Sequence, residues 1–495
     1  MPANLVRANF KSGGDVRARI FAEENRKWWT LWAVAFGLFM IMLDNTIVNV
    51  ALPSIQRNLH IGISELEWVV NGYALTFAVL MLTGGKLADL LGRRLIFMVG
   101  LAIFTGASLA CGLAPTAGFL IGARVVQGVG AALMNPSTLS IISATFPPRQ
   151  RGMAIGIWAG VSALALAIGP LLGGVITQHI GWSWIFFINI PVGILAIVVA
   201  RVVIRESRDT SAEQRLDLPG LTSSALGLFA LTYALIEANK YGWTSARILA
   251  LFALAVAGLV AFVWLELRQR IPMLDLSLFR NPTFAGANAV MLLVALAMFG
   301  VFFYVSLYVQ NVLHYSPTQA GATFLPMTLC IVILAPIAGR LTDRFGPRWL
   351  IASGMTLVAG SLVIFAQLDQ YSNFWNIFPG LLIGGAGMAM SMAPTTATAM
   401  HAVPVDKAGV GSAVLNSMRQ VGGSLGIAII GAIVAAFVHV PPTSPLAVPQ
   451  FVDGFQRALI VASGIAFSAA VIAVVTLRKP EHEEELSRVP EEVPA

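Results

Sequence analysis

The feature that most constrains the fold of this chain is a series of long apolar runs, each bounded by charge, proline or glycine. A helix that crosses a bilayer needs about 20 apolar residues, and the bilayer core holds no water to satisfy the backbone. Each of these runs therefore predicts a membrane-spanning helix. We expect fourteen such helices, at residues 29–52, 68–90, 95–113, 118–146, 152–176, 184–204, 218–238, 247–267, 285–309, 318–339, 349–368, 374–399, 408–438 and 455–477.

The composition of the 495 residues agrees with an all-α polytopic membrane protein. Hydrophobic residues make up 57% and charged residues only 11%, against about 25% charged in soluble domains. These values exclude a soluble globular protein, a disordered chain and a collagen. The first apolar run begins near Trp28 and is too long for a signal-peptide core, so we expect it to be the first span.

Several classes of site have no basis in this sequence. No Gly-Lys-Ser/Thr occurs, so ATP-driven pumping has no P-loop. Cys111 and Cys330 lie inside apolar runs and the histidines are scattered, so we expect no disulfide framework and no metal site, and we expect no cofactor. A Gly-x-Ser-x-Gly match at 422–426 lies within an apolar run rather than at a strand-to-helix turn. We expect it to be a packing face, and we do not expect an enzyme.

The distribution of basic residues predicts the orientation of the chain. If the N-terminus is inside, 25 of the 31 Lys and Arg residues fall in inside segments, four fall outside, and Arg124 and Arg419 lie within spans. Such a bias is typical of cytoplasmic loops. The net charge of +7 is therefore explained by membrane topology and not by nucleic-acid binding. We expect both tails in the cytoplasm.

An internal repeat predicts two matching halves. Segment 85–94 has the sequence GKLADLLGRR and segment 339–348 has GRLTDRFGPR, an offset of eight predicted helices. Two six-helix halves with two inserted helices would give this spacing, an architecture typical of secondary transporters. The expected divisions are a tail at 1–28, a first half at 29–204, a linker with helices 7 and 8 at 205–270, a second half at 271–477 and a tail at 478–495.

Asp44 is the only carboxylate that these boundaries place deep inside a span, since Glu237 and Glu266 fall at helix ends. A charge at mid-bilayer costs about 2.5–3.5 kcal/mol, so we expect a functional, inward-facing group that can exchange a proton. The alternative is a structural contact with Asn45 or Asn49. Arg124 lies at a similar predicted depth and is the expected partner; the alternative is an ion pair that only fixes helix packing. With one buried acid, the simplest cycle exchanges one proton for one substrate.

Two further segments are candidates for moving parts. In segment 85–94, Gly85 permits a close backbone approach, while Asp89, Arg93 and Arg94 can pair with neighbouring helices; the alternative is a purely topogenic role. Gly152, Gly156 and Gly160 recur every fourth residue and give a flat packing face, which continues through Gly169, Gly173 and Gly174 beyond the flexible break at Pro170.

Seven motifs together resemble the fourteen-span drug:proton antiporters of the major facilitator superfamily, the EmrB/QacA type. They are LDNTIVNVALPSIQ (43–56), GKLADLLGRR (85–94), RVVQGVGAA (124–132), AIGPLLGG (167–174), WSWIFFINIPVG (182–193), PMLDLSLFRNPTF (272–284) and NSMRQVGGSLG (416–426). The sequence departs from the family at Ser183, where an arginine is usual.

The resemblance implies a proton-coupled exporter of amphipathic or cationic drug-like compounds that works by alternating access. It implies proton coupling at Asp44 and Arg124, and a gate at Gly169, Pro170, Gly173 and Gly174. It also implies a cytoplasmic clamp, whose residues are Gly85, Asp89, Gly92, Arg93, Arg94 and Asp343. The alternative within transport is a dedicated exporter of one endogenous metabolite or lipid. A membrane enzyme or receptor would need a catalytic constellation or a sensor domain, and the sequence shows neither.

The expected substrate pocket combines polar and aromatic residues of both halves: Asn45, Asn49, Gln127, Phe303, Tyr304, Asn416, Arg419 and Gln420. The aromatic residues could equally face lipid or core, and Arg419 could hold backbone carbonyls instead of a substrate. The expected partners are a small-molecule substrate, protons and the bilayer, with no nucleic acid. We expect a functional monomer in the bacterial cytoplasmic membrane; a periplasmic adaptor and the substrate identity stay open.

Overall fold

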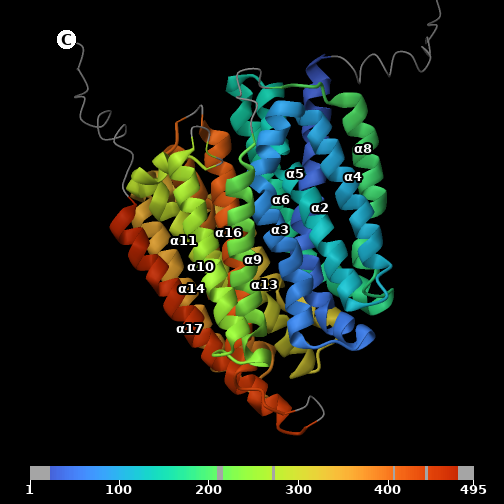
Figure 1. Cartoon of the computed structure of the whole chain (residues 1–495), viewed down its shortest axis with the longest axis vertical. Helices are drawn as coiled ribbons and strands as arrows, with labels where there is room; N and C mark the ends of the chain where they lie inside the picture. Colours follow the sequence, from blue (N-terminus) through green and yellow to red (C-terminus); the bar gives the residue numbers. More distant parts are fainter. Residues whose placement is uncertain are drawn as a thin grey trace, which may run out of the picture.

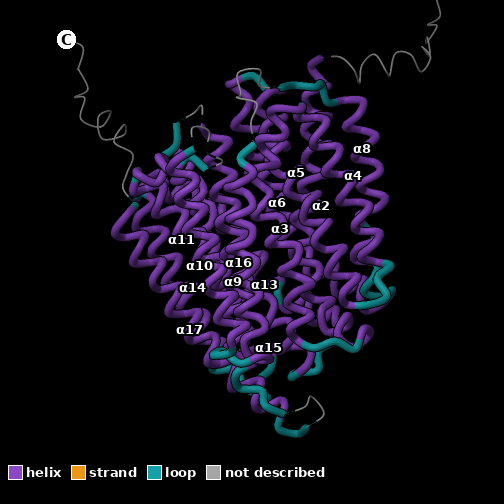
Figure 2. The backbone as a smooth tube through the Cα atoms, viewed as in Figure 1, coloured by secondary structure: helices purple, strands orange, loops and turns teal. Residues whose placement is uncertain are grey.

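The computed structural model of this chain describes residues 23–208, 216–269, 272, 274–404, 407–440 and 444–477. Fourteen helices in these ranges are long and apolar enough to cross a membrane, which confirms the predicted number. Loops join the helices directly, and no strand occurs within the described ranges (Figure 2). The fold class predicted from the apolar runs is therefore correct, because only helices satisfy their backbone within a single apolar segment.

We group the helices by the predicted division into a first half, an inserted pair and a second half. The first half consists of α2 (Glu23–Leu59), α3 (Ile63–Leu91), α4 (Arg93–Gly112), α5 (Ala117–Thr145), α6 (Pro148–His179), α7 (Trp184–Phe187) and α8 (Asn189–Val203). The inserted pair is α9 (Leu218–Tyr241) and α10 (Ala246–Arg268). The second half consists of α11 (Pro282–Asn311), α12 (Pro317–Thr323), α13 (Leu325–Phe345), α14 (Pro347–Phe365), α15 (Phe374–His401), α16 (Ala408–Ala435) and α17 (Ala447–Thr476).

Two of the predicted spans are broken, and proline explains both breaks. The span predicted at 184–204 consists of α7 and α8, with Pro191 in the first turn of α8. The span predicted at 318–339 consists of α12 and α13, with Pro326 in the first turn of α13. Proline lacks the N–H that would continue the preceding helix, so it is favoured where a new helix begins.

The internal repeat of the sequence is also a repeat of backbone geometry. Gly92 ends α3 and begins α4 with φ = 125°, and Gly346 ends α13 and begins α14 with φ = 80°. Positive φ values favour glycine. Each half therefore makes the same corner at the same place in its sequence.

The two halves lie side by side, with the inserted pair against their junction (Figure 1). We call the face that holds the start of α2 and the end of α17 the tail side, and the opposite face the far side. The main contacts between the halves are α3 with α16, α6 with α12, and α2 with α11. In the inserted pair, α9 packs on α10 and also touches α3 and α16.

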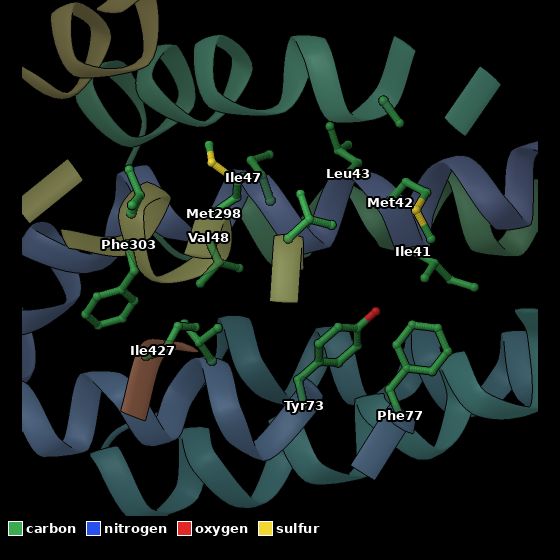
Figure 3. Close-up of a cluster of buried hydrophobic side chains, with 14 of the residues drawn as sticks. Ile41, Met42, Leu43, Ile47, Val48, Tyr73, Phe77, Met298, Phe303 and Ile427 are labelled. Carbon is green, nitrogen blue, oxygen red and sulfur yellow. The ribbon is translucent and has the colours of Figure 1, made fainter. Parts of the chain in front are cut away.

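One continuous apolar core extends across both halves. Figure 3 shows its centre, where Ile47 and Val48 of α2 lie near Tyr73 of α3, Met298 of α11 and Ile427 of α16. Polar residues within this core are therefore held by helices from both halves, and that is where the candidate site lies.

Candidate functional site

Asp44 and Arg124 form an ion pair in the interior of the first half. Each is 1% exposed, and Arg124 Nη1 donates a hydrogen bond to Asp44 Oδ2 at 2.5 Å. Asp44 lies mid-way along α2, and Arg124 lies two turns into α5. The depths estimated from the sequence therefore predicted this contact correctly.

Gln127 joins the pair and completes a buried polar network. Its Oε1 accepts a hydrogen bond from Arg124 Nη1 at 2.7 Å, and its Nε2 donates to Asp44 Oδ1 at 3.0 Å and to Ser108 Oγ at 2.9 Å. Asn189 of α8 also donates to Ser108 Oγ. The sequence placed Gln127 in the substrate pocket; its side chain is fully buried in this network instead, one helical turn from Arg124.

Further contacts fix the orientation of Arg124. Its Nε donates to the Val69 carbonyl at 3.0 Å, and its guanidinium lies 4.3 Å from the centre of the Tyr73 ring. The centre of the Phe186 ring, on α7, lies 5.8 Å from the same guanidinium. Protonation of Asp44 would remove the charge that this guanidinium balances, so the network can exist in a paired and a released arrangement. The change would affect every helix that contributes a contact to this network, namely α2, α3, α5 and α7.

A narrow enclosed cavity lies next to this network and between the halves. It has room for about one water molecule. Its polar lining comes from Asn45, Asn49, Tyr73, Arg124 and Gln420, and its apolar lining from Val48, Val70, Ala74, Phe299, Gly423 and Ile427. Three of the predicted pocket residues therefore meet here, and Arg124 connects the cavity to the ion pair.

The other predicted pocket residues lie elsewhere. Phe303 and Tyr304 are fully buried in the core and do not line this cavity, which agrees with the alternative that the sequence left open for them; Phe299, one turn earlier on α11, lines it. Asn416 donates to the Ser412 carbonyl of its own helix. The helical phase of α11 decides which aromatic residue points inward, and its uniformly apolar sequence gives no phase signal.

Arg419 is partly buried on α16, and its closest polar contact in the described structure is the sulfur of Met42 at 4.0 Å. Its Nε has no hydrogen-bond partner among the described residues. The predicted alternative in which it holds backbone carbonyls is therefore not what the structure has. Gln420, beside it, also presents a buried unpartnered Nε2. Two donors on α16 are thus available to an acceptor group.

The predicted clamp segment is anchored within the first half. Asp89 of α3 pairs at 3.0 Å with Arg93 at the start of α4, across the corner between the two helices. The backbone N–H groups of Arg94 and Leu95 donate to Glu206, which follows α8. Gly92 forms the corner between α3 and α4. A Cβ added at Gly85 would lie 3.4 Å from the side chain of Pro136 on α5. Asp343 lies on α13, but its side chain is outside the described residues.

Glu206 was not predicted, although a carboxylate is well suited to the exposed N–H groups at a helix start. Glu206 was missed because it lies in a charged loop, where an acidic residue usually faces solvent and gives no sign of a partner. The predicted clamping of one half to the other by this segment stays a prediction, because Asp89, Arg93 and Arg94 contact one another and the segment after α8, all within the first half.

The predicted gate residues make a close contact between the halves at the far side. A Cβ on Gly174 of α6 would lie 2.3 Å from the Pro317 carbonyl oxygen of α12. A Cβ on Gly321 of α12 would lie 2.2 Å from the Pro170 carbonyl oxygen of α6. Gly169 and Gly173 approach Thr46 and Ile47 of α2 equally closely. We call the mutual contact of Pro170, Gly174, Pro317 and Gly321 the glycine–proline contact.

In contrast to its far-side part, the tail-side part of α6 makes no close contact through its glycines. A Cβ on Gly152, Gly156 or Gly160 would meet no atom within 4 Å, so the prediction that these residues pack closely is wrong in this conformation. Further hydrogen bonds between the halves lie toward the far side, from Ser306 Oγ to the Asn49 carbonyl and from Gln310 Nε2 to the Val50 carbonyl. The structure is closed at the far side.

Asp44 is not the only buried carboxylate in the membrane-spanning region. Glu67 of α3 is 3% exposed, and Glu237 and Glu266 are also buried. The conclusion drawn from a single buried acid, one proton for one substrate, no longer follows from counting. The predicted span began at residue 68, whereas α3 begins at Ile63. A carboxylate just before a tryptophan resembles a loop residue at the membrane surface, which is why Glu67 was missed.

The Gly-x-Ser-x-Gly match lies within α16, as predicted. A Cβ on Gly422 or Gly426 would lie within 2.1 Å of a carbonyl oxygen of α11. The motif is therefore a packing face between two helices.

The family model and the similar proteins of known function point to the same family. The sequence model of the Major Facilitator Superfamily matches residues 34–427. The tetracenomycin C resistance and export protein of Streptomyces glaucescens is 36% identical, covering 95% of this chain and 94% of that protein. The multidrug resistance protein Stp of Mycobacterium tuberculosis is 37% identical (92% and 84%), and the puromycin resistance protein pur8 of Streptomyces alboniger is 37% identical (91% and 92%).

Solved structures agree at the level of the fold. A bacterial homolog of the human lysosomal transporter Spinster, inward-facing and unoccupied, aligns with a TM-score of 0.64 at 16% identity, covering 92% of this chain and 99% of that one. A peptide transporter POT in complex with sulfate aligns with a TM-score of 0.64 at 15% identity, with coverage of 90% and 95%.

Proposed function

Because this chain belongs to the major facilitator superfamily, we propose that it is a proton-coupled secondary exporter of amphipathic, cationic or neutral lipophilic compounds that works by alternating access. The observation that carries the proposal is the Asp44–Arg124–Gln127 network, a titratable carboxylate buried beside a cavity that both halves line. An intramembrane acid in such a place marks a proton or substrate pathway. The tail side would then be the cytoplasm, as the charge bias indicates.

In this mechanism Asp44 is protonated from the far side and deprotonated on the tail side. A neutral Asp44 releases Arg124, and the cavity lining changes because Arg124 is part of it. Substrate then occupies the space between the halves after they separate at the tail side. The glycine–proline contact keeps the far side closed during that step. No cofactor beyond the proton gradient takes part.

The breadth of substrates distinguishes two versions of the proposal. The relatives above include proteins named for resistance to one compound and one named for multidrug resistance. We favour several substrates, because Gln420 lines a cavity of mixed polar and apolar side chains and Arg419, next to it in sequence, also has an unpartnered donor, so neither donor is committed to one acceptor. The alternative is a dedicated exporter of one metabolite or lipid, and it would protect cells against few compounds.

The protein is proposed to act as a monomer in the bacterial cytoplasmic membrane, with both tails in the cytoplasm. Its ligands would be one small molecule and protons, and nucleic acid has no part. Whether a periplasmic adaptor joins it is a separate question of assembly.

The test is substrate-induced proton release from the purified protein in proteoliposomes, screened across cationic, neutral and anionic compounds. Wild-type protein should release protons on binding a cationic or neutral lipophilic compound, and Asp44→Asn should not. As a matched control, Asp369→Asn changes an exposed far-side carboxylate and should behave as wild type. Uphill transport by Asp44→Asn at the wild-type rate would remove Asp44 from the mechanism.

A further inference from the structure

Glu67 lies where the two halves and the inserted pair meet. It belongs to α3 of the first half, and its Oε1 accepts a hydrogen bond at 2.5 Å from the hydroxyl of Tyr304, on α11 of the second half. A Cβ on Gly431 of α16 would lie 1.9 Å from the same oxygen. Beside it, Asn239 of α9 donates to the Ala432 carbonyl of α16 at 2.7 Å. Glu67 is therefore enclosed by α3, α11, α16 and α9.

The charged groups around Glu67 do not neutralise it. On α9, Glu237 is close enough to act on it electrostatically, and Lys240 pairs with Glu237 at 3.8 Å. On α5, Arg124 bonds the carbonyl of Val69 but is paired with Asp44. On its own helix, Glu65 caps the backbone N–H of Gly62.

The remaining neighbours add no cation. The α16 segment from Ile427 to Ala435 has no titratable residue, and α11 contributes only the Tyr304 phenol. Among the described residues, no cation lies within ion-pair distance of Glu67. An ionised carboxylate in such a place would be costly, because burying a charge without a partner costs several kcal/mol.

The cost of that charge depends on the conformation. With the far side closed, Glu67 is shielded by Tyr304 and Gly431, which belong to the other half. When the halves separate there, water hydrates the carboxylate and replaces the hydrogen bond from the Tyr304 hydroxyl. The ionised form therefore favours the far-open conformation and the neutral form favours the closed one, since a ligand shifts a conformational equilibrium by its differential affinity.

We propose that Glu67 is a second proton-binding site of this transporter, which takes a proton from the far-side solution when the halves separate there and, once neutral, favours their closure against Tyr304. The proposal rests on the proposed function as a proton-coupled transporter. Glu67 Oε2 would accept the proton from hydronium while the far side is open, and Oε1 would accept the hydrogen bond from Tyr304 again when the halves close. The proton would return to far-side water when that side opens at higher pH.

The test follows the far-side distance between the halves as a function of pH, by spin labels on cysteines at His179 and Tyr371 in full-length protein in lipid nanodiscs. Both positions are exposed and belong to different halves. Cys111 and Cys330 are first replaced by serine. All variants carry Asp44→Asn, so that the first proton site makes no contribution.

In this background the ratio of far-open to far-closed protein should rise with pH, by up to about tenfold per pH unit, the limit for one linked proton. Adding Glu67→Gln should abolish this dependence and leave the protein far-closed. The matched control Glu65→Gln, two residues away on the same helix, should keep the slope. A slope that survives in Glu67→Gln overturns the proposal.

Tyr304→Phe provides a second readout if Glu67→Gln does not fold. Without the phenol, the closed conformation loses its bond to Glu67, so the far-open fraction at low pH should rise while the slope is kept. An unchanged far-open fraction would contradict the proposed role of Tyr304 and Glu67. Failure of the proposed function itself would be seen separately, as uphill export by Asp44→Asn without any change in rate.

Discussion

Two amides that the sequence assigned to one pocket have different surroundings. Gln127 bonds Asp44, Arg124 and Ser108, whereas the hydrogen bond that Asn416 donates within the described structure goes to a carbonyl of its own helix. Both residue types are common in transport pockets, and neither sequence position reveals which partner the side chain finds. The difference has a measurable consequence.

Gln127→Ala should lower proton-coupled transport by about 10- to 100-fold. Hydrogen bonds to charged groups contribute about 1.5–3 kcal/mol, and every 1.4 kcal/mol corresponds to a factor of ten. Initial rates of uphill export in proteoliposomes measure the effect. Asn416→Ala is the matched control and should stay within about threefold of wild type, because its side chain leaves no buried partner behind. Equal losses in both variants would mean that Gln127 has no special part in the network.

The Asp44–Arg124 contact could be predicted because depth along a helix follows from residue count alone. Glu67 could not, because its burial is produced by α11 and α16, which are more than 200 residues away in sequence. The orientation of Phe303 and Tyr304 could not be predicted for the same reason. Sequence shows that α11 is apolar on all sides, and only packing decides which side faces the cavity.

At the scale of helices, the glycine–proline contact joins α6 to α12 through backbone atoms. Gly174→Ala should disturb it, because the new methyl group would meet the Pro317 carbonyl at 2.3 Å. Overpacking of this kind costs about 1–3 kcal/mol. We expect a larger far-open population and a proton leak, measured as pH decay in proteoliposomes without substrate. Gly106→Ala on α4, where a Cβ meets no atom within 4 Å, should leak no more than wild type.

The clamp segment gives a second prediction at this scale. Within the described part of the chain Asp89 bonds Arg93, a partly exposed ion pair of little value to stability. If Asp89 holds the tail side closed in the alternate conformation, Asp89→Asn should increase the tail-open population. A cysteine at Gly156, on the open face of α6, should then react faster with a soluble thiol reagent. Lys86→Gln, in the same segment, is the control. Unchanged labelling would leave Asp89 and its neighbours with a topogenic role only.

Helix ends were the least predictable part of the fold. The spans predicted at 68–90 and 95–113 meet close to the true corner at Gly92, because glycine acts through local backbone geometry. The span predicted to end at residue 339 was too short, since α13 extends through Phe345 to the corner at Gly346. The apolar runs underestimated α2, which extends through Leu59, because the polar residues that extend it beyond the apolar core resemble a loop. Length beyond the membrane core depends on neighbouring helices and not on local hydropathy.

For the whole molecule, the charge bias predicts one orientation in the membrane. Single cysteines at Arg208 and Arg344, both exposed on the tail side, should react with an impermeant reagent only after the cytoplasm is made accessible. A cysteine at Tyr371, which is 83% exposed on the far side, should react in intact cells. The reverse pattern would contradict the orientation and, with it, the direction of transport proposed above.

If the two halves rotate against each other at the contact of Gly174 with Pro317, that contact would act as a pivot for the whole molecule. It lies near one end of α6, and the tail-side end at Pro148 is 26 residues away, or about 39 Å along the helix. A rotation of about 10° at the pivot would therefore displace the tail-side end by about 7 Å, by the geometry of a lever of that helix length. Because the pivot is made of backbone atoms, its position does not depend on side-chain rotamers. Small movements there would therefore open a passage for a substrate at the opposite face.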